Sequence, residues 1–453
     1  MRDDSGFVWG AGSSAYQVEG AAAEDGRTPS IWDAFCARAG TIDDASDGSV
    51  ACDSYHRWEE DLALLTELGL DAYRFSVSWP RVVPGGRGEA NQAGLDYYER
   101  LVDGLLDRGL RPFLTLYHWD LPQELQEAGG WTARDTAYAF ADYAAVVAAR
   151  LGDRVEAYAT LNEPWCSSFL AHEIGEHAPG ERSPERAQAA VHHLLLGHGL
   201  ALARLRETAP GSRQGIVLNF TPAYPLDPSD PEHSEAARRH DVHNHQVFLR
   251  PLLQGSYPAE AAAQPGSAAS YVREGDMDVI SGRLDYLGIN YYTRALVAPA
   301  PEAPWPHVAS VRADGRPHTD MGWEVYPQGL EDLILRVWRE SGLPIYVTEN
   351  GAGLIEPDSL GGAGGLEDGR RWEYLESHIA AMERARSAGA DVRGYFAWSL
   401  LDNFEWARGY TRRFGIVHVD FATQARTPKL SARRYAEHVA SARLLSSASP
   451  PPR

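Results

Sequence analysis

Short apolar runs alternate with longer amphipathic stretches along this chain. In the longer stretches apolar residues recur every three or four positions, which predicts helices with one buried face. We predict helices over Glu59–Leu68, Gly94–Arg108, Ala133–Arg150 and Pro184–Leu205. The apolar runs are short and rich in β-branched and aromatic side chains, which favours strands. We predict strands over Phe7–Gly10, Ala72–Ser76, Pro112–Leu116, Ala157–Leu161, Gly215–Asn219, Tyr286–Asn290, Ile345–Thr348 and Gly394–Trp398.

Strands that alternate with helices predict an α/β fold of parallel strands joined by right-handed crossovers. Eight such units fit a single (β/α)₈ TIM barrel, with a doubly wound open sheet as the competing architecture. The chain shows no repeat and no long linker, so we expect one domain over residues 1–443. The stretches 300–320 and 355–370 are expected to be loops, and residues 444–453 a disordered tail.

Polar and aromatic residues follow several of the predicted strands directly. The C-terminal strand ends of a barrel carry the active site, so these residues are the candidates for chemistry. They are His118 and Trp119 after the third strand, Asn162 and Glu163 after the fourth, Asn290 and Tyr292 at the sixth, and Glu349 and Asn350 after the seventh.

Two of these residues, Glu163 and Glu349, suit cleavage of a glycosidic bond. That reaction needs an acid to protonate the leaving oxygen and a carboxylate to capture the sugar carbon. The fourth and seventh strands lie across a closed barrel from each other, so the two carboxyl groups can face one substrate. We expect them roughly 5 Å apart, the separation of a retaining enzyme. The alternative is a pair of capping or solvated glutamates, which the neighbouring Asn162 and Asn350 make less favourable.

Charge and cysteine usage narrow the function classes. With 63 acidic and 42 basic residues the formal charge is −21, which disfavours nucleic-acid and membrane-surface partners. The three cysteines, an odd number without a CxxC pair, favour reduced thiols over disulfides or zinc. No apolar signal core opens the sequence and no run of eighteen apolar residues follows. We therefore expect a cytoplasmic protein.

Three further patterns suggest cofactors or metals, and we expect neither. GAGSSA at Gly10–Ala15 resembles a dinucleotide fingerprint, but glycines and a proline interrupt the helix that should follow. HEIGEH at 172–177 lacks the second histidine of a zinc-binding HExxH. The histidine groups 192, 193 and 198, and 240, 243 and 245, are better explained as surface or groove residues.

Ordered motifs along nearly the whole chain resemble glycoside hydrolase family 1, the β-glucosidase family. They run from FVWGAGSSAYQVEGA near the start, through YRFSVSWPR, LYHWDLP, TLNEPW, LGINYYT, TDMGWEVYPQGL, YVTENG and GYFAWSLLDNFEWARGY, to YTRRFGIVHVD. The resemblance implies a single (β/α)₈ barrel and a mechanism that retains anomeric configuration.

The resemblance also implies roles for individual residues. Glu163 corresponds to the general acid/base and Glu349 to the nucleophile. Arg74 and Tyr292 resemble the groups that keep the nucleophile ionised. Asn162 would bond the sugar 2-OH and Asn290 would support the pair. The sugar-binding set is Gln17, His118, Glu405 and Trp406 for the hydroxyl groups, Trp398 for stacking, Trp119 for a further N–H contact, and Trp165 with Trp323 on the aglycone side.

Two specialised branches of the family are not matched. The plant thioglucosidase branch has Gln at the acid/base position, where this chain has Glu163. The phospho-glycosidase branch has Ser at the position of Trp406, with Lys and Tyr nearby, where this chain has Arg412 and Phe414. We therefore expect an unphosphorylated substrate.

The resemblance implies an exo-acting enzyme that releases a β-linked sugar from the non-reducing end through a covalent glycosyl-enzyme. The expected partners are small β-glycosides or short β-linked oligosaccharides, with no cofactor. Glucose, fucose and galactose remain open as the preferred sugar, as do the aglycone, the oligomeric state and capture of the intermediate by an alcohol instead of water. A catalytically inactive sugar-binding barrel and a nicotinamide oxidoreductase are the competing classes.

Overall fold

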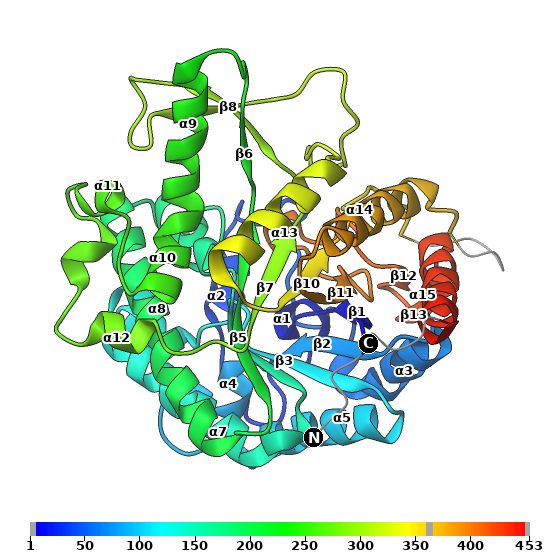
Figure 1. Ribbon diagram of the computed structural model, residues 1–453. Helices are drawn as coiled ribbons and strands as arrows, with labels where there is room; N and C mark the ends of the chain where they lie inside the picture. The colour runs from blue at the N-terminus through cyan, green and yellow to red at the C-terminus, as the bar shows by residue number, and fades with distance from the viewer. Residues whose placement is uncertain (1–5, 359–365, 449–453) are drawn as a thin grey trace.

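The computed structural model describes residues 6–358 and 366–448. Within these residues eight parallel strands close into a barrel, in the order β1–β11–β10–β7–β5–β4–β3–β2 (Figure 1). They are β1 (Val8–Gly12), β2 (Ala72–Ser76), β3 (Arg111–Tyr117), β4 (Ala157–Asn162), β5 (Arg213–Phe220), β7 (Tyr286–Tyr291), β10 (Ile345–Asn350) and β11 (Val392–Ala397). The barrel closes where β1 pairs with both β2 and β11, which confirms the TIM barrel and excludes an open sheet.

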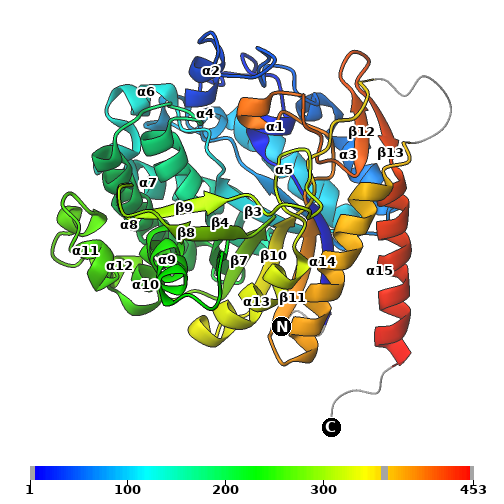
Figure 2. The ribbon, with the colours of Figure 1, turned by 90° about the horizontal axis from the view of Figure 1, so that it is seen from above.

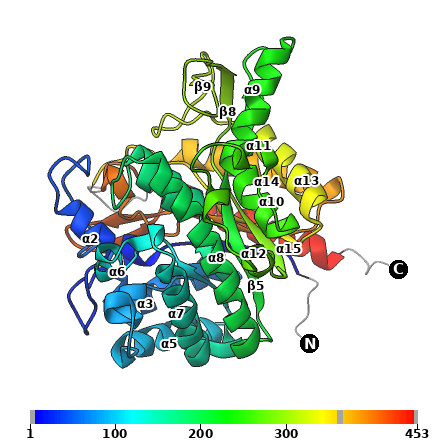
Figure 3. The ribbon, with the colours of Figure 1, turned by 90° about the vertical axis from the view of Figure 1, so that its left-hand side faces the viewer.

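Helices surround the barrel on its outside (Figures 1 and 3). The longer ones are α3 (Ser54–Glu67), α5 (Gln92–Asp107), α7 (Asp135–Leu151), α8 (Pro184–Thr208), α9 (Pro231–Asp241), α13 (Pro327–Ser341), α14 (Gly369–Ser387) and α15 (Leu430–Ala448). Shorter ones are α1 (Ala15–Val18), α2 (Ile31–Cys36), α4 (Trp79–Val82), α6 (Gln123–Glu127), α10 (Val247–Gln254), α11 (Ala259–Ala262) and α12 (Asp276–Ile280). Single-turn or π-helical segments are η1 (Pro84–Gly86), η2 (Gly130–Thr132), η3 (Gly152–Arg154), η4 (Cys166–Ile174), η5 (Val242–Gln246), η6 (Ala268–Tyr271) and η7 (Trp406–Arg408).

The barrel interior changes from apolar to polar along its axis. A buried cluster fills the end at which the strands begin: Val8, Ala72, Phe113, Ala157, Tyr286, Tyr346 and Phe396. Side chains alternate along a strand, so Arg74 points to the same side as Ala72, and Asn290 to the same side as Tyr286. The inward positions therefore form an apolar floor first and a polar layer above it, at the C-terminal strand ends.

A small sheet extends beyond those C-terminal ends. Strand β6 (Ala223–Pro225), which follows β5, pairs in parallel with β8 (Ala295–Pro299), which follows β7. Strand β9 (Val308–Val311) pairs antiparallel with β8. Figures 1 and 3 show this sheet and α9 projecting from one side of the barrel. A separate hairpin joins β12 (Val417–Asp420) to β13 (Ala425–Pro428).

The predicted strands match the barrel strands to within two residues at either end. The stretch 300–320, predicted as a loop, contains β9, and part of the predicted loop 355–370 lies outside the described residues. Helix α15, which lies beside α14 in Figure 2, continues to Ala448. It includes the first five residues of the segment predicted as a tail, and the rest of that segment lies outside the described residues. Within the described ranges no helix has the length and apolar character needed to cross a membrane.

The single lysine of the chain, Lys429, lies in a buried ionic cluster behind β11 and the loop that follows it. Its Nζ donates to Asp402 Oδ1 at 2.7 Å and also contacts Glu356. Asp402 Oδ2 accepts from Arg413 Nη1 at 3.0 Å, and Arg371 contacts Glu356. Burial of a charged group costs desolvation free energy, and in this cluster each charged side chain is paired with one of opposite sign.

Candidate active site

A pocket of about 560 Å³ opens at the C-terminal ends of the barrel strands. Eleven residues predicted from sequence line it: His118, Trp119, Glu163, Trp165, Asn290, Tyr292, Trp323, Glu349, Trp398, Glu405 and Trp406. Arg74, Asn162 and Gln17 are buried directly behind the lining and hydrogen-bond to residues that belong to it. The structure thus brings every predicted site residue to one place.

Glu163 follows β4 in a left-handed backbone conformation, with φ of +49°. Its own N–H donates to the carbonyl of Val217 on β5 at 2.9 Å, which fixes this turn against the barrel. The residue is only 6% exposed, and its carboxyl group accepts from Asn290 Nδ2 and Cys166 Sγ. Burial, with the nearby charge of Glu349, raises the pKa of Glu163 to about 8. This carboxyl group is therefore suited to hold a proton near neutral pH.

Glu349 lies near the end of β10 and has different partners. Arg74 Nη1 donates to its Oε1 at 2.6 Å, and the Tyr292 hydroxyl donates to its Oε2 at 2.6 Å. Burial raises the pKa of Glu349, while the Arg74 charge and the Tyr292 hydrogen bond act against that rise. When the two carboxyl groups titrate as a pair, these partners make Glu349 the one that ionises first.

Asn290 connects the two halves of the site. Its amide donates to Glu163 Oε1 at 2.7 Å and to Asn162 Oδ1 at 3.0 Å. Its carbonyl oxygen accepts from Thr348 Oγ1 at 2.7 Å, which fixes the amide orientation. Arg74 Nη2 also donates to Asn162 Oδ1, at 2.6 Å. One hydrogen-bonded network therefore holds both carboxyl groups at the same face of the pocket.

The predicted sugar-binding residues form a second group around Glu405. Gln17 Nε2 donates to Asn403 Oδ1 at 3.0 Å and to the Phe404 carbonyl at 2.9 Å, and lies 3.5 Å from Glu405 Oε2. Burial, with the nearby charges of Glu349 and Glu163, raises the pKa of Glu405 to about 8. The His118 ring lies nearly parallel to Trp398 and Trp406, with centroids 5.7 and 5.9 Å away. The result is a polar corner with flat aromatic walls.

Comparison with known proteins gives one family over nearly the whole chain. The family model described as "Glycosyl hydrolase family 1" matches residues 3–443. The chain belongs to glycosyl hydrolase family 1. A family 1 relative, a β-glucosidase of Agrobacterium sp., is 46% identical over 433 residues, covering 95% of this chain and 93% of the relative. A bifunctional β-D-glucosidase/β-D-fucosidase of Bifidobacterium breve is 44% identical, covering 96% and 97%.

Solved β-glucosidase structures resemble nearly the whole chain. The psychrophilic β-glucosidase of Micrococcus antarcticus superimposes with a TM-score of 0.91 at 48% identity, covering 96% of this chain and 97% of that one. The family 1 β-glucosidase of Thermotoga maritima gives 0.92 at 42% identity, covering 96% and 98%. The family resemblance drawn from the motifs is confirmed.

Trp119, which is expected to offer its indole N–H to the sugar, lines the pocket of this family 1 site. In the structure its Nε1 donates to the Asn162 carbonyl at 2.9 Å, and its backbone has a φ of +82°. The ring also lies against Trp406, with centroids 4.5 Å apart. Trp119 thus contributes a ring surface and a support for Asn162.

Trp165 and Trp323, the predicted aglycone residues, both line the outer part of the family 1 pocket. Trp165 Nε1 donates to Asn244 Oδ1 at 2.9 Å. The Trp323 ring lies 5.3 Å from Tyr292. Several other residues also line the pocket, and the sequence analysis assigned them no role in it: Cys166, Glu176, His177, Arg294, Met321 and Arg408.

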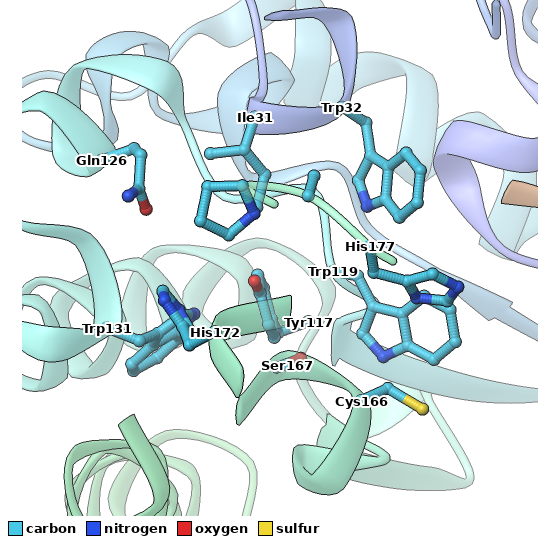
Figure 4. A pocket seen from close by; sticks show the side chains of 12 residues that line it. Ile31, Trp32, Tyr117, Trp119, Gln126, Trp131, Cys166, Ser167, His172 and His177 are labelled. Carbon is cyan, nitrogen blue, oxygen red and sulfur yellow. The ribbon is translucent and has the colours of Figure 1, made fainter. Parts of the chain in front are cut away.

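A small cavity of about 10 Å³ lies behind the wall that Trp119 and Cys166 form (Figure 4). Figure 4 shows Trp32, Trp131 and Ser167 around it. Trp119, Cys166 and His177 also line the main pocket, so these three side chains lie between the two spaces. Its size restricts it to a water molecule.

The GAGSSA segment and the two histidine groups do not form cofactor or metal sites among the described residues. The helix after Gly12, α1, has four residues, so GAGSSA does not open a dinucleotide-binding crossover. His192 Nε2 lies 2.9 Å from Asp276, and His245 Nδ1 lies 2.7 Å from Asp241, each in a local pair. Among the described residues no group of three or more His, Cys, Asp or Glu side chains is arranged to hold a metal ion.

Proposed function

We propose that this family 1 protein is a retaining, exo-acting β-glucosidase in which Glu349 is the nucleophile and Glu163 the general acid/base. The observation that carries the assignment is the difference in partners. Arg74 and Tyr292 donate to Glu349, which favours a permanent carboxylate. Glu163 has a pKa raised to about 8, which favours a group that holds a proton until it is needed.

In the first step Glu349 attacks the anomeric carbon of a β-glucoside while Glu163 protonates the leaving oxygen. The bond to the aglycone breaks, and a sugar linked covalently to Glu349 forms. Once Glu163 has lost its proton, the charge near Glu349 is neutralised by the bond, and Glu163 accepts hydrogen bonds from Asn290 and Cys166 as a carboxylate.

In the second step Glu163 removes a proton from water, which attacks the same carbon from the side that the aglycone left. The bond to Glu349 breaks and Glu163 is protonated again. Two inversions retain the configuration. The Arg74 guanidinium and the Tyr292 hydroxyl stabilise Glu349 as it leaves, because both already point at its oxygens.

The sugar specificity rests on the corner formed by Gln17, Glu405 and Trp398. The two oxygens of the Glu405 carboxyl group can bond two adjacent hydroxyl groups, and a sugar lacking one of them leaves a buried polar group unpaired. Trp398 offers a flat ring to the sugar face. Trp406 and Phe414 occupy positions where a 6-phosphate would need ligands. We therefore propose unphosphorylated glucosides, together with fucosides and galactosides, as substrates.

A panel of aryl β-glycosides tests the function. The purified protein, without added cofactor, should release the aryl alcohol from β-glucoside and hydrolyse cellobiose, with kcat/KM on 6-phospho-β-glucoside at least about a hundredfold lower. Comparable values on the phosphorylated substrate would show that the pocket has been misread. Lack of hydrolysis of every glycoside in the panel would favour a sugar-binding protein without catalytic activity.

We further propose that the protein acts in the cytoplasm on small β-glycosides or short β-linked oligosaccharides. Its three cysteines are all free thiols, as expected in a reducing compartment. Names of two relatives, 1,4-β-D-glucan glucohydrolases from Thermotoga neapolitana strains, fit short glucan fragments among such substrates.

A further inference from the structure

The two oxygens of the Glu163 carboxyl group have different neighbours. Oε1 accepts from the Asn290 amide at 2.7 Å, and Oε2 accepts from Cys166 Sγ at 3.1 Å. Cys166 begins η4, and its backbone N–H donates to the Glu163 carbonyl at 2.9 Å. Main chain and side chain of Cys166 therefore both contact the residue assigned as the acid/base, within one turn.

The surrounding bonds determine which oxygen carries the transferable proton. The Asn290 amide orientation is fixed, because its carbonyl oxygen accepts from Thr348 Oγ1 and its NH₂ group donates to Asn162 and Glu163. Oε1 therefore always meets an N–H donor. A proton on Oε1 would oppose that hydrogen, so the acid form of Glu163 carries its proton on Oε2, beside the Cys166 sulfur.

The chemistry of a thiol suits both forms of Glu163. Burial, with the nearby charge of Glu163, raises the pKa of the Cys166 thiol well above its usual range, so it stays an S–H group. Against the carboxylate the thiol donates, and against the carboxylic acid the sulfur accepts weakly. A permanent strong donor at the same place would favour only the carboxylate.

We propose that Cys166 is a positioning residue for Glu163, holding its proton-carrying oxygen in one orientation opposite Asn290 through both steps of the reaction. This inference rests on the proposed function, since it assigns Cys166 a task only if Glu163 is the acid/base. Cys166 contacts Glu163 and acts through it.

The charged and titratable groups that act on Glu163 come from several elements. They are Arg74 on β2, Cys166 on η4, Tyr292 after β7, Glu349 on β10 and Glu405 before η7. Substitution of Cys166 leaves the other four in place. A change in the alkaline limb of the pH profile would therefore report the contact with the thiol.

The test compares substrates with good and poor leaving groups. Dinitrophenolate leaves with little protonation, whereas the glucose of cellobiose needs the acid. In Cys166→Ala, kcat/KM for cellobiose should fall about fivefold and that for the dinitrophenyl β-glucoside less than about twofold, since only the first depends on a well-placed proton. Cys166→Ser keeps a donor and acceptor at that place and should recover most of the loss on cellobiose.

The pH profile of kcat/KM gives a second readout. Loss of a donor to the carboxylate should move the alkaline limb of Cys166→Ala to higher pH by about half a unit. Cys166→Ser should not show that upward shift, because a hydroxyl donates at least as strongly as a thiol. Ser168→Ala is the matched control, since it removes a buried hydroxyl from the same segment that donates to the Pro164 carbonyl. This variant should change kcat/KM for both substrates by the same factor and leave the alkaline limb of the pH profile at its wild-type position.

Equal losses on the two substrates in Cys166→Ala, an unmoved alkaline limb, or a Cys166→Ser variant as impaired as Cys166→Ala would each overturn the inference and leave Cys166 as a packing residue. Thermal unfolding of each variant shows whether it is folded, and the serine variant tests the inference even if the alanine variant is not. A wild-type protein inactive on both substrates would instead contradict the proposed function.

Discussion

Glu163 and Glu349 lie in one pocket, and under the proposed function the charged partner of Glu349, Arg74, assigns a different step to each. Arg74 and Tyr292 stabilise negative charge on Glu349 in every stage at which it is free. Glu163 accepts from an amide and a thiol, which are neutral donors. Neutral donors leave a carboxyl group able to alternate between acid and base, whereas a guanidinium would hold it ionised.

Azide rescue tests the two roles separately. Glu349→Ala should lose activity by at least about 10⁴-fold, since no covalent intermediate forms, and azide should restore turnover with α-glucosyl azide as product. Glu163→Ala should still react with the dinitrophenyl glucoside, accumulate the intermediate, and give β-glucosyl azide. NMR of the products decides the matter. If the two anomers came from the opposite variants, the roles would have to be exchanged.

The pH profile should report the same asymmetry. Activity needs Glu349 ionised and Glu163 protonated, so it should fall in acid as Glu349 gains a proton and in base as Glu163, with a pKa of about 8, loses one. Tyr292→Phe removes a donor to the carboxylate form of Glu349, which raises the pKa of Glu349. The acid limb of kcat/KM should move up by about one unit.

Tyr291→Phe is the control for that measurement. The Tyr291 hydroxyl donates to the Tyr326 carbonyl and so leaves the carboxylates alone. Its acid limb should stay with that of the wild type. If the acid limb of the kcat/KM profile of Tyr292→Phe matched that of the wild type, ionisation of Glu349 would not determine that limb.

The positions of single residues in the site were predictable from sequence where a motif contains them. Glu163 and Glu349 were placed because an acidic residue there points into the barrel mouth. The Cys166 contact was not, since it depends on the left-handed turn at Glu163, which no local preference of glutamate predicts. The bond from the Trp119 N–H to the Asn162 carbonyl was likewise not predicted from sequence.

At the scale of elements, the loops after β5 and β7 shape the outer pocket. They pair as β6 and β8, and the following segment turns back to carry Trp323 over the site. Arg294 joins these parts, with Nε and Nη2 donating to the two Glu324 oxygens at 2.9 and 3.1 Å. Its guanidinium also lies 3.8 Å from the centre of the Tyr326 ring. A bidentate pair of this kind fixes orientation as well as distance.

Arg294→Ala should loosen the segment that carries Trp323 and weaken binding of the aglycone. We expect KM for cellobiose to rise about three- to tenfold with kcat for an aryl glucoside nearly unchanged, because the carboxyl groups keep their partners. Steady-state kinetics on both substrates measures this. Arg316→Ala, an exposed arginine of the same segment, is the control. A cellobiose KM that stays at the wild-type value would remove Arg294 from the aglycone site.

The barrel strands were predictable because each is a short, buried run followed by a helix. The small sheet was not, because its strands are three to five residues long and only partly buried. Their pairing is decided by contacts between loops far apart in the sequence. The helical extension to Ala448 was missed because the serines of that stretch have weak helix preference, which the continuity of α15 outweighs.

Across the whole molecule, the C-terminal helix and the sugar-binding loop are tied together by the buried cluster around Lys429. Asp402, three residues before Glu405, accepts from Lys429 Nζ at 2.7 Å and Arg413 Nη1 at 3.0 Å. The attachment of α15 to the barrel and the placement of the Glu405 loop therefore share one set of charges. Substitution of Lys429 should therefore weaken the attachment of α15 and also displace the Glu405 loop.

Lys429→Met should lower the free energy of unfolding by about 3–5 kcal/mol, since it leaves buried carboxylates short of a partner. The midpoint of urea unfolding measures the loss, and a raised KM for glucosides should accompany it. Arg434→Met removes an exposed ion pair with Glu437 on the same helix and should cost less than about 1 kcal/mol. Similar midpoints for the two variants would show that the cluster contributes little to stability.

With its only lysine enclosed, the protein presents arginine guanidinium groups to the solvent but no side-chain amine. A free reducing sugar in its open-chain form carries an aldehyde, which condenses with primary amines and hardly with protonated guanidinium. The enzyme thus releases glucose beside a surface that glucose has little means to modify, apart from the amino terminus of the chain. The same feature means that a succinimidyl ester dye or an aldehyde-coated support should find no reactive side-chain amine on the native protein.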